Sequence, residues 1–108
     1  MKNFKVEKRK LLRLFISESD RWNGQPLYNA IIELCKERGL SGVTVFRGLA
    51  GYGNHKKVHT DKILALSGDL PLLVEIILCE DQVDEIVTAA QEMLDGGLIT
   101  MEDIEVVC

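Results

Sequence analysis

Alternation of apolar and polar positions predicts strands along this chain. Leu12, Leu14 and Ile16 lie on one face of the stretch 10–17, and the stretch LLVEIILC, residues 72–79, alternates in the same way. Successive side chains of a strand point to opposite faces, so each stretch is expected to bury one face. We also predict strands over 43–49 and, more briefly, over 104–107. Residues 62–67 form a weaker strand candidate.

Apolar residues at helical spacing predict two helices. The first is expected to start at Pro26, which suits a first helical position, and to end at Gly39. The second has Asp81 as its candidate N-cap residue and Gly96-Gly97 as its end. The apolar positions are Leu27, Ala30, Ile31, Leu34 and Cys35 in the first helix, and Val83, Ile86, Val87, Ala90 and Leu94 in the second.

The resulting order is βαββαβ, which is the ferredoxin-like pattern of the α+β class. We therefore predict an antiparallel sheet in a single domain, 1–108, with both helices covering one face. The other face would be apolar as well, and such a surface favours an interface between copies of the chain. Within it Glu75 is expected to pair with a cation such as Arg13. The apolar residues predicted on this second face are Leu11, Phe15, Leu73, Ile77 and Val107.

Composition fits one small globular domain. The 108 residues are 46% hydrophobic and carry a formal net charge of −4, which argues against a surface built for nucleic acid. The basic N-terminus is followed by a short apolar run that Arg13 interrupts, so we predict no signal peptide and a cytoplasmic protein. Cys35 and Cys79 fall in apolar periodic runs and are interpreted as buried hydrophobic residues, whereas Cys108 is expected to be exposed.

The stretch RGLAGYGNHKK, residues 47–57, contains three glycines followed by histidine and lysines. Glycines allow backbone N–H groups to surround an anion, and Arg47 with the later lysines adds positive charge. The spacing from Gly48 to Gly53 matches a phosphate loop, but Asn54-His55 replaces its Lys-Ser/Thr, so an anion cradle and a plain hairpin loop both stay open. His55 and His59 are interpreted as solvated residues rather than metal ligands, and we predict no metal site.

Three stretches resemble the PII nitrogen-regulatory signal proteins. They are ERGLSGVTV from Glu37, the GYG of residues 51–53, and LPLLVEIILCEDQVDEIV from Leu70. The earlier LLRLFISESDRWNGQPLYNAI, followed by T-V-x-R-G-x-x-G-Y-G, resembles the PII-like bacterial family called domain of unknown function 190. This second resemblance covers nearly the whole chain.

The resemblance implies a homotrimer that binds an adenine nucleotide in each cleft between subunits. The adenine would lie against the start of the second main strand, and the phosphates near the loop base and near the glycines after the second helix. A T-loop-like segment, about 50–60, would gate contact with a partner protein such as a membrane transporter. With Arg47 and Gly48 from the loop pattern, the nucleotide-site candidates are Gly42, Val43, Thr44, Arg47, Gly48, Gly51, Tyr52, Gly53, Gly96 and Gly97. The candidates for partner contact are Asn54, His55, Lys56 and Lys57.

The sequence departs from the PII pattern where charge is concerned. Thr100 to Asp103 reads T-M-E-D where PII proteins have G-D-G-K, and their two C-terminal arginines have no counterpart before Cys108. We therefore expect ADP or AMP to be favoured over ATP, with no other cofactor. The alternative is a nucleotide-independent trimeric scaffold that resembles the copper-tolerance PII-like proteins. We do not expect an enzyme, because the acylphosphatase motif of this strand order is missing after the first strand.

Overall fold

The computed structural model describes residues 3–51, 59–60, 69–95 and 97–108. Its main sheet has four antiparallel strands in the order β4-β7-β1-β8. These strands are β1 (Val6–Ser17), β4 (Gly42–Arg47), β7 (Pro71–Leu78) and β8 (Leu98–Val107). The helices are α1 (Leu27–Glu37) and α3 (Val83–Met93), with a short 3₁₀ turn, η1 (Glu80–Gln82), ahead of α3.

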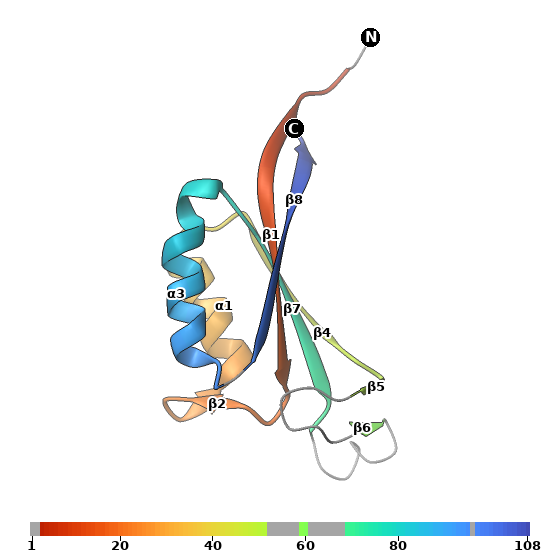
Figure 1. Cartoon of the computed structure of the whole chain (residues 1–108), viewed down its shortest axis with the longest axis vertical. Coiled ribbons are helices and arrows are strands. Elements are labelled where there is room, and N and C mark those ends of the chain that lie inside the picture. The colour runs from red at the N-terminus through yellow and green to blue at the C-terminus, as the bar shows by residue number, and fades with distance from the viewer. Residues whose placement is uncertain (1–2, 52–58, 61–68, 96) are drawn as a thin grey trace.

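Both helices lie on one side of the sheet, as Figure 1 shows, and the predicted ferredoxin-like α+β fold is confirmed. Each βαβ unit skips one strand, so β1 and β7 become the two central strands. Both termini lie at one end of the sheet, and the short strands β5 and β6 lie at the other (Figure 1). Neither described helix is long and apolar enough to cross a membrane.

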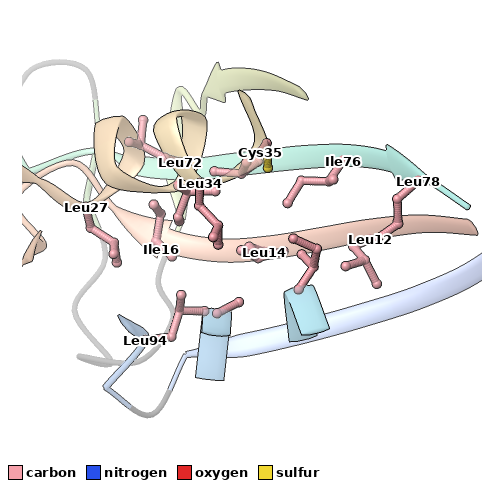
Figure 2. Close-up of a cluster of buried hydrophobic side chains, with 14 residues drawn as sticks. Leu12, Leu14, Ile16, Leu27, Leu34, Cys35, Leu72, Ile76, Leu78 and Leu94 are labelled. Carbon is pink, nitrogen blue, oxygen red and sulfur yellow. The ribbon is translucent and has the colours of Figure 1, made fainter. Parts of the chain in front are cut away.

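The core lies between the helices and the helix side of the central strands (Figure 2). Leu12 and Leu14 of β1 are fully buried there, as are Val74 and Ile76 of β7. Ile31 of α1 and Ile86 of α3 pack against them from the helix layer. This arrangement follows from the two periodicities, because a strand buries every second residue and a helix buries one stripe. All five apolar positions predicted for the first helix are buried, whereas Val83 and Val87 of the second are only half-buried.

Short strands complete the fold at two places. Asn23 and Gly24 have positive φ angles, 49° and 81°, and join β2 (Arg21–Trp22) to β3 (Gln25–Pro26) in a tight hairpin. Asn-Gly is a strong signal for such a hairpin. At one edge of the main sheet, β5 (Ala50–Gly51) pairs with β6 (His59–Thr60). The strand candidate at 62–67 lies outside the described residues.

Several strands of the main sheet differ in length from the prediction. β1 begins at Val6 rather than Lys10, and β8 begins at Leu98 rather than 104. In the added part, charged residues face each other across the strands: Lys8 lies opposite Glu105, and Lys10 opposite Asp103. Opposite charges stabilise cross-strand pairs as apolar residues do, so a search for apolar alternation misses this part. β4 ends at Arg47, two residues before the predicted end.

The predicted N-cap role of Asp81 is wrong. Asp81 lies inside the turn η1, and Gln82 precedes α3. The side chain of Gln82 accepts a hydrogen bond from the Cys79 backbone N–H at 3.0 Å, and this contact closes the turn before the helix begins. Pro26 precedes α1 as its cap rather than opening it, and Gly39, with φ 66°, follows its end as predicted.

The second face of the sheet carries the predicted apolar residues with one exception. Phe15 lies opposite Leu73, and Leu11 lies opposite Ile77. Val107 is the exception, because it pairs with Val6 and therefore has the same orientation as the helix-side residues of β1. The Arg13–Glu75 pair is confirmed, since Arg13 Nε donates to Glu75 Oε2 at 3.0 Å, and Arg13 Nη1 also donates to Glu102 at 3.0 Å.

The cysteines occupy different environments. Cys35 is buried in the core as predicted, and burial raises the pKa of its thiol to about 11. Cys79 is only half-buried, so its predicted burial is wrong, because β7 ends at Leu78 and Cys79 lies after the strand. Cys108 is exposed.

We therefore predict that Cys35 resists alkylation while the protein is folded. Iodoacetamide at pH 8 should label Cys108 first and leave Cys35 unlabelled until denaturant is added, because both burial and the raised pKa suppress the thiolate. Peptide mapping by mass spectrometry measures both rates, and Cys108→Ser assigns the fast one. Native labelling of Cys35 at the rate of Cys108 would contradict the packing described above.

Candidate functional site

The base of the glycine-containing segment is built on the end of the sheet where β1 and β4 finish. Gly48 N–H donates to the Pro71 carbonyl at 2.8 Å, and Glu18 N–H donates to the Leu70 carbonyl at 2.7 Å. The start of β7 is thus held on both sides by backbone hydrogen bonds. The short pairing of Gly51 with His59 lies immediately beyond.

Two glycines of the predicted cradle have structural reasons to be glycine. A Cβ on Gly48 would lie 3.1 Å from Pro71 Cγ and 3.3 Å from the Pro71 carbonyl oxygen. Gly51 has φ 152°, a value that side chains disfavour. Because the N–H of Gly48 is already bonded to Pro71, this residue contributes close strand packing rather than an anion contact.

Arg47, the cation of the predicted cradle, is engaged within the chain. Its Nη2 forms an ion pair with a carboxylate oxygen of Glu18. Arg47 lies on the edge strand β4 opposite Leu72 of β7, and Leu72 lies opposite Ile16 of β1. The pair with Glu18 therefore crosses β7, so that the guanidinium is directed over the sheet and not toward its outer edge.

Glu18 belongs to a turn that also contacts Asp69, two residues before β7. The backbone N–H of Asp20 donates to the Ser17 carbonyl at 3.0 Å, and the Ser17 N–H donates to the Asp20 carboxylate at 2.9 Å. Ser19 Oγ donates to the carboxylate of Asp69 at 2.5 Å. Glu18 and Ser19 thus hold Arg47 and Asp69. Sequence reasoning missed both residues, and a polar loop after a strand offers no local signal for such contacts.

The residues predicted to contact adenine lie at the opposite end of β4. Val43 packs against the core, whereas Thr44 is exposed on the second face. A Cβ on Gly42 would find no heavy atom within 4 Å, so the packing of this chain leaves open space there. From Gly42 to Gly48 an extended strand covers about 20 Å. Within one chain, the predicted adenine contacts are therefore not close to the predicted anion cradle around Gly48.

Gly97 lies at the same end of the sheet as Gly48, but at the opposite edge. The row from Phe46 through Leu73 and Phe15 to Leu98 crosses all four strands. At about 4.8 Å per strand, the two edges are about 14 Å apart. Beside Gly97 is a hollow of about 330 Å³, lined by Gln91, Leu94, Gly97 and Ile99.

Several predicted site residues lie outside the described residues. They are Tyr52, Gly53, Asn54, His55, Lys56, Lys57 and Gly96.

The stretch Thr100 to Asp103 forms part of the regular strand β8. Asp103 is bonded to Lys10, and this contact lowers the pKa of the Asp103 carboxyl. The strand between Gly97 and Asp103 spans about 20 Å. The Asp103 carboxylate is therefore remote from Gly97.

Comparison with known proteins assigns the family. The family described as uncharacterized ACR, DUF190, matches residues 9–106. The chain belongs to the DUF190 family. A UPF0166 protein from Aquifex aeolicus is 45% identical over 105 residues, which is 95% of this chain and 97% of that protein. A UPF0166 protein from Methanocaldococcus jannaschii is 32% identical over 100 residues, 92% of each chain.

Solved structures show that this DUF190 chain has the PII-like fold. CPII, a nitrogen regulatory PII-like protein from Thiomonas intermedia, has been solved bound to ADP, AMP and bicarbonate. It matches with a TM-score of 0.73 and 18% identity over 94% of this chain and 91% of that chain. A putative PII-like signaling protein from Thermus thermophilus matches with a TM-score of 0.62 and 19% identity, covering 94% of this chain and 90% of that chain.

The packing around Gly42 and Gly48 generates a prediction about stability. Gly48→Ala should destabilise the fold by about 1–3 kcal/mol, because its Cβ would press on a carbonyl that the Gly48 N–H already holds. Gly42→Ala should leave stability unchanged or raise it slightly, since its site is open and alanine suits a strand better than glycine. Urea unfolding of both variants tests this, and equal effects would contradict the difference in packing.

Proposed function

We propose that this DUF190 protein is a PII-like signalling protein that binds an adenine nucleotide, ADP or AMP in preference to ATP, in clefts between subunits of a homotrimer. The observation that carries the proposal is the placement of the glycines. Gly51 lies just beyond the edge strand β4, and Gly97 lies at the other edge of the same end of the sheet. A ring of copies joined edge to edge would bring the two sets together.

The charges on the two edges support a nucleotide with few phosphates. Residues 70–108 contain no lysine, arginine or histidine. Arg13, which lies opposite Thr100 on the neighbouring strand, already donates to Glu75 and Glu102. Positive charge comes from the Arg47 edge, where the next lysines in sequence are Lys56 and Lys57. That CPII binds ADP and AMP on the same fold supports this class of ligand.

The second face of the sheet supports assembly. Phe46, Leu73, Phe15 and Leu98 form an apolar row across all four strands. Phe15 is 40% exposed, Phe46 48% and Leu98 59%, which is a large apolar surface for a monomer. Packing of three such faces around an axis would cover the row.

In this proposal the segment 50–60 is the part that contacts a partner protein, with a membrane transporter among the partners that the PII resemblance implies. Nucleotide binding would bias that contact only if the ligand binds one state of the segment more tightly than another. A trimer that binds no nucleotide would instead be a scaffold.

Nucleotide binding is tested by calorimetric titration with AMP, ADP and ATP, each with and without Mg²⁺. We expect saturable binding at one nucleotide per subunit, with ADP or AMP bound more tightly than ATP. Gly42→Val should weaken binding by about tenfold or more, because a side chain would fill the open space proposed for adenine. Gly42 suits this test better than Gly51, whose φ of 152° makes any substitution strained.

The matched control is Ser41→Val, which adds a similar side chain at the exposed position before β4. Sedimentation must show that both variants keep the assembly state of the unmodified protein. Absence of binding by all three nucleotides would refute the sensor proposal and favour the scaffold. If both valine variants lose the same nucleotide affinity, the assignment of Gly42 to the adenine site is refuted, but nucleotide binding itself is not.

Assembly through the second face makes its own prediction. Phe15→Asp should convert the trimer to monomers, because the substitution would bury a carboxylate without a partner. Analytical ultracentrifugation measures the mass directly. Met101→Asp is the control, since Met101 is an exposed apolar strand residue, 53% exposed, on the helix side of β8. A monomeric unmodified protein, or a Phe15→Asp trimer, would rule out this interface.

A further inference from the structure

The turn after β1 places a carboxylate on the cation of the proposed site. Glu18 pairs with Arg47 Nη2, and its side chain is only 20% exposed, whereas that of Arg47 is 63% exposed. The partners come from different strands, since Glu18 follows the central strand β1 and Arg47 ends the edge strand β4. The contact is therefore made by the tertiary fold and not by neighbours in sequence.

The backbone holds the position of Glu18 firmly. Its N–H is bonded to the Leu70 carbonyl at 2.7 Å, and the turn that contains it is closed by two hydrogen bonds between Ser17 and Asp20. Arg47, in contrast, has a long side chain at the edge of the sheet. When the two side chains separate, it is therefore the guanidinium that has room to move outward.

An anion bound at the outer edge of β4 would require that outward movement or would share the guanidinium with Glu18. In the first case binding must break the ion pair, and in the second the phosphates lie near a fixed negative charge. The Arg47–Glu18 pair is neutral as a unit, so each added phosphate gains little attraction from it. Residues 70–108 along the Gly97 edge contain no cation, and Arg13 of the neighbouring strand is already paired with Glu75 and Glu102.

We infer that Glu18 is a specificity-determining residue of the proposed nucleotide site, which it biases toward ligands with fewer phosphates by neutralising Arg47. The inference rests on the proposed function. It gives a cause within this chain for the preference for ADP or AMP. It also assigns a role to a residue that the resemblance to PII proteins does not mark.

Glu18→Gln tests the inference, because glutamine keeps the shape and the backbone contact to Leu70 while removing the charge. Calorimetric titration with AMP, ADP and ATP, without Mg²⁺, compares the variant with the unmodified protein. We expect tighter binding for all three, with the gain rising by about threefold for each added phosphate charge, as for unit charges about 6 Å apart in water. The gain should shrink between about 50 and 500 mM NaCl, since salt screens exposed charges.

Two further variants separate this effect from simpler ones. Arg47→Gln should weaken binding most for ATP, because it removes the cation and leaves the Glu18 carboxylate unpaired. Adding Glu18→Gln should therefore restore part of the loss, by a factor that rises with the number of phosphates. Glu85→Gln is the matched control: Glu85 forms the same type of pair with Arg38, which precedes the start of β4 and is therefore at the opposite end of that strand from Arg47. Its substitution also removes one negative charge from the chain. Thermal unfolding confirms that each variant is folded.

The outcomes distinguish the inference from the proposed function. If Glu18→Gln weakens all three nucleotides equally, Glu18 only positions Arg47, and the inference is wrong although the protein binds nucleotide. The inference is also wrong if Glu85→Gln produces the same gain, since net charge would then explain it. If neither the unmodified protein nor Glu18→Gln binds any nucleotide, both proposals fail, whereas binding by Glu18→Gln alone supports the inference directly.

Discussion

The pairing of β1 on both of its sides is the constraint on which this structure depends. β1 lies between β7 and β8, and its register with each decides which residues face the helices and which face away. A shift of one residue would exchange Leu12 and Leu14 for Arg13 and Phe15 in the core. The buried helix side prevents that shift, because Leu12 and Leu14 are fully buried and Arg13 would lack a partner there.

The same register builds the two surfaces that the proposed function uses. It aligns Phe46, Leu73, Phe15 and Leu98 in one row on the second face. It also ends β1 beside the start of β7, so that the following turn reaches both Arg47 and Asp69. The proposed interface and the proposed specificity of the site thus share one structural origin.

The candidate site is divided between the edges of the sheet, and this division explains its composition. One edge has Arg47 with its carboxylate partner and glycines that pack closely on Pro71. The other has Gly97, the hollow next to Leu94, and only acidic or neutral side chains after it in sequence. A ligand between two such edges would be held by groups of low net charge. This agrees with the proposed preference for nucleotides that carry few phosphates.

The sequence by itself determined the order of elements, the helix side of each central strand and the Arg13–Glu75 pair. Those features follow from periods of 2 and 3.6 residues and from the cost of a buried carboxylate without a partner. Only the tertiary structure decided the lengths of β1 and β8, where Lys10 faces Asp103 although 93 residues separate them in sequence. It alone revealed that Glu18 engages Arg47, 29 residues away, and that Gly48 is a packing residue. Contacts of this kind depend on which strands become neighbours, and local periodicity has no information about that.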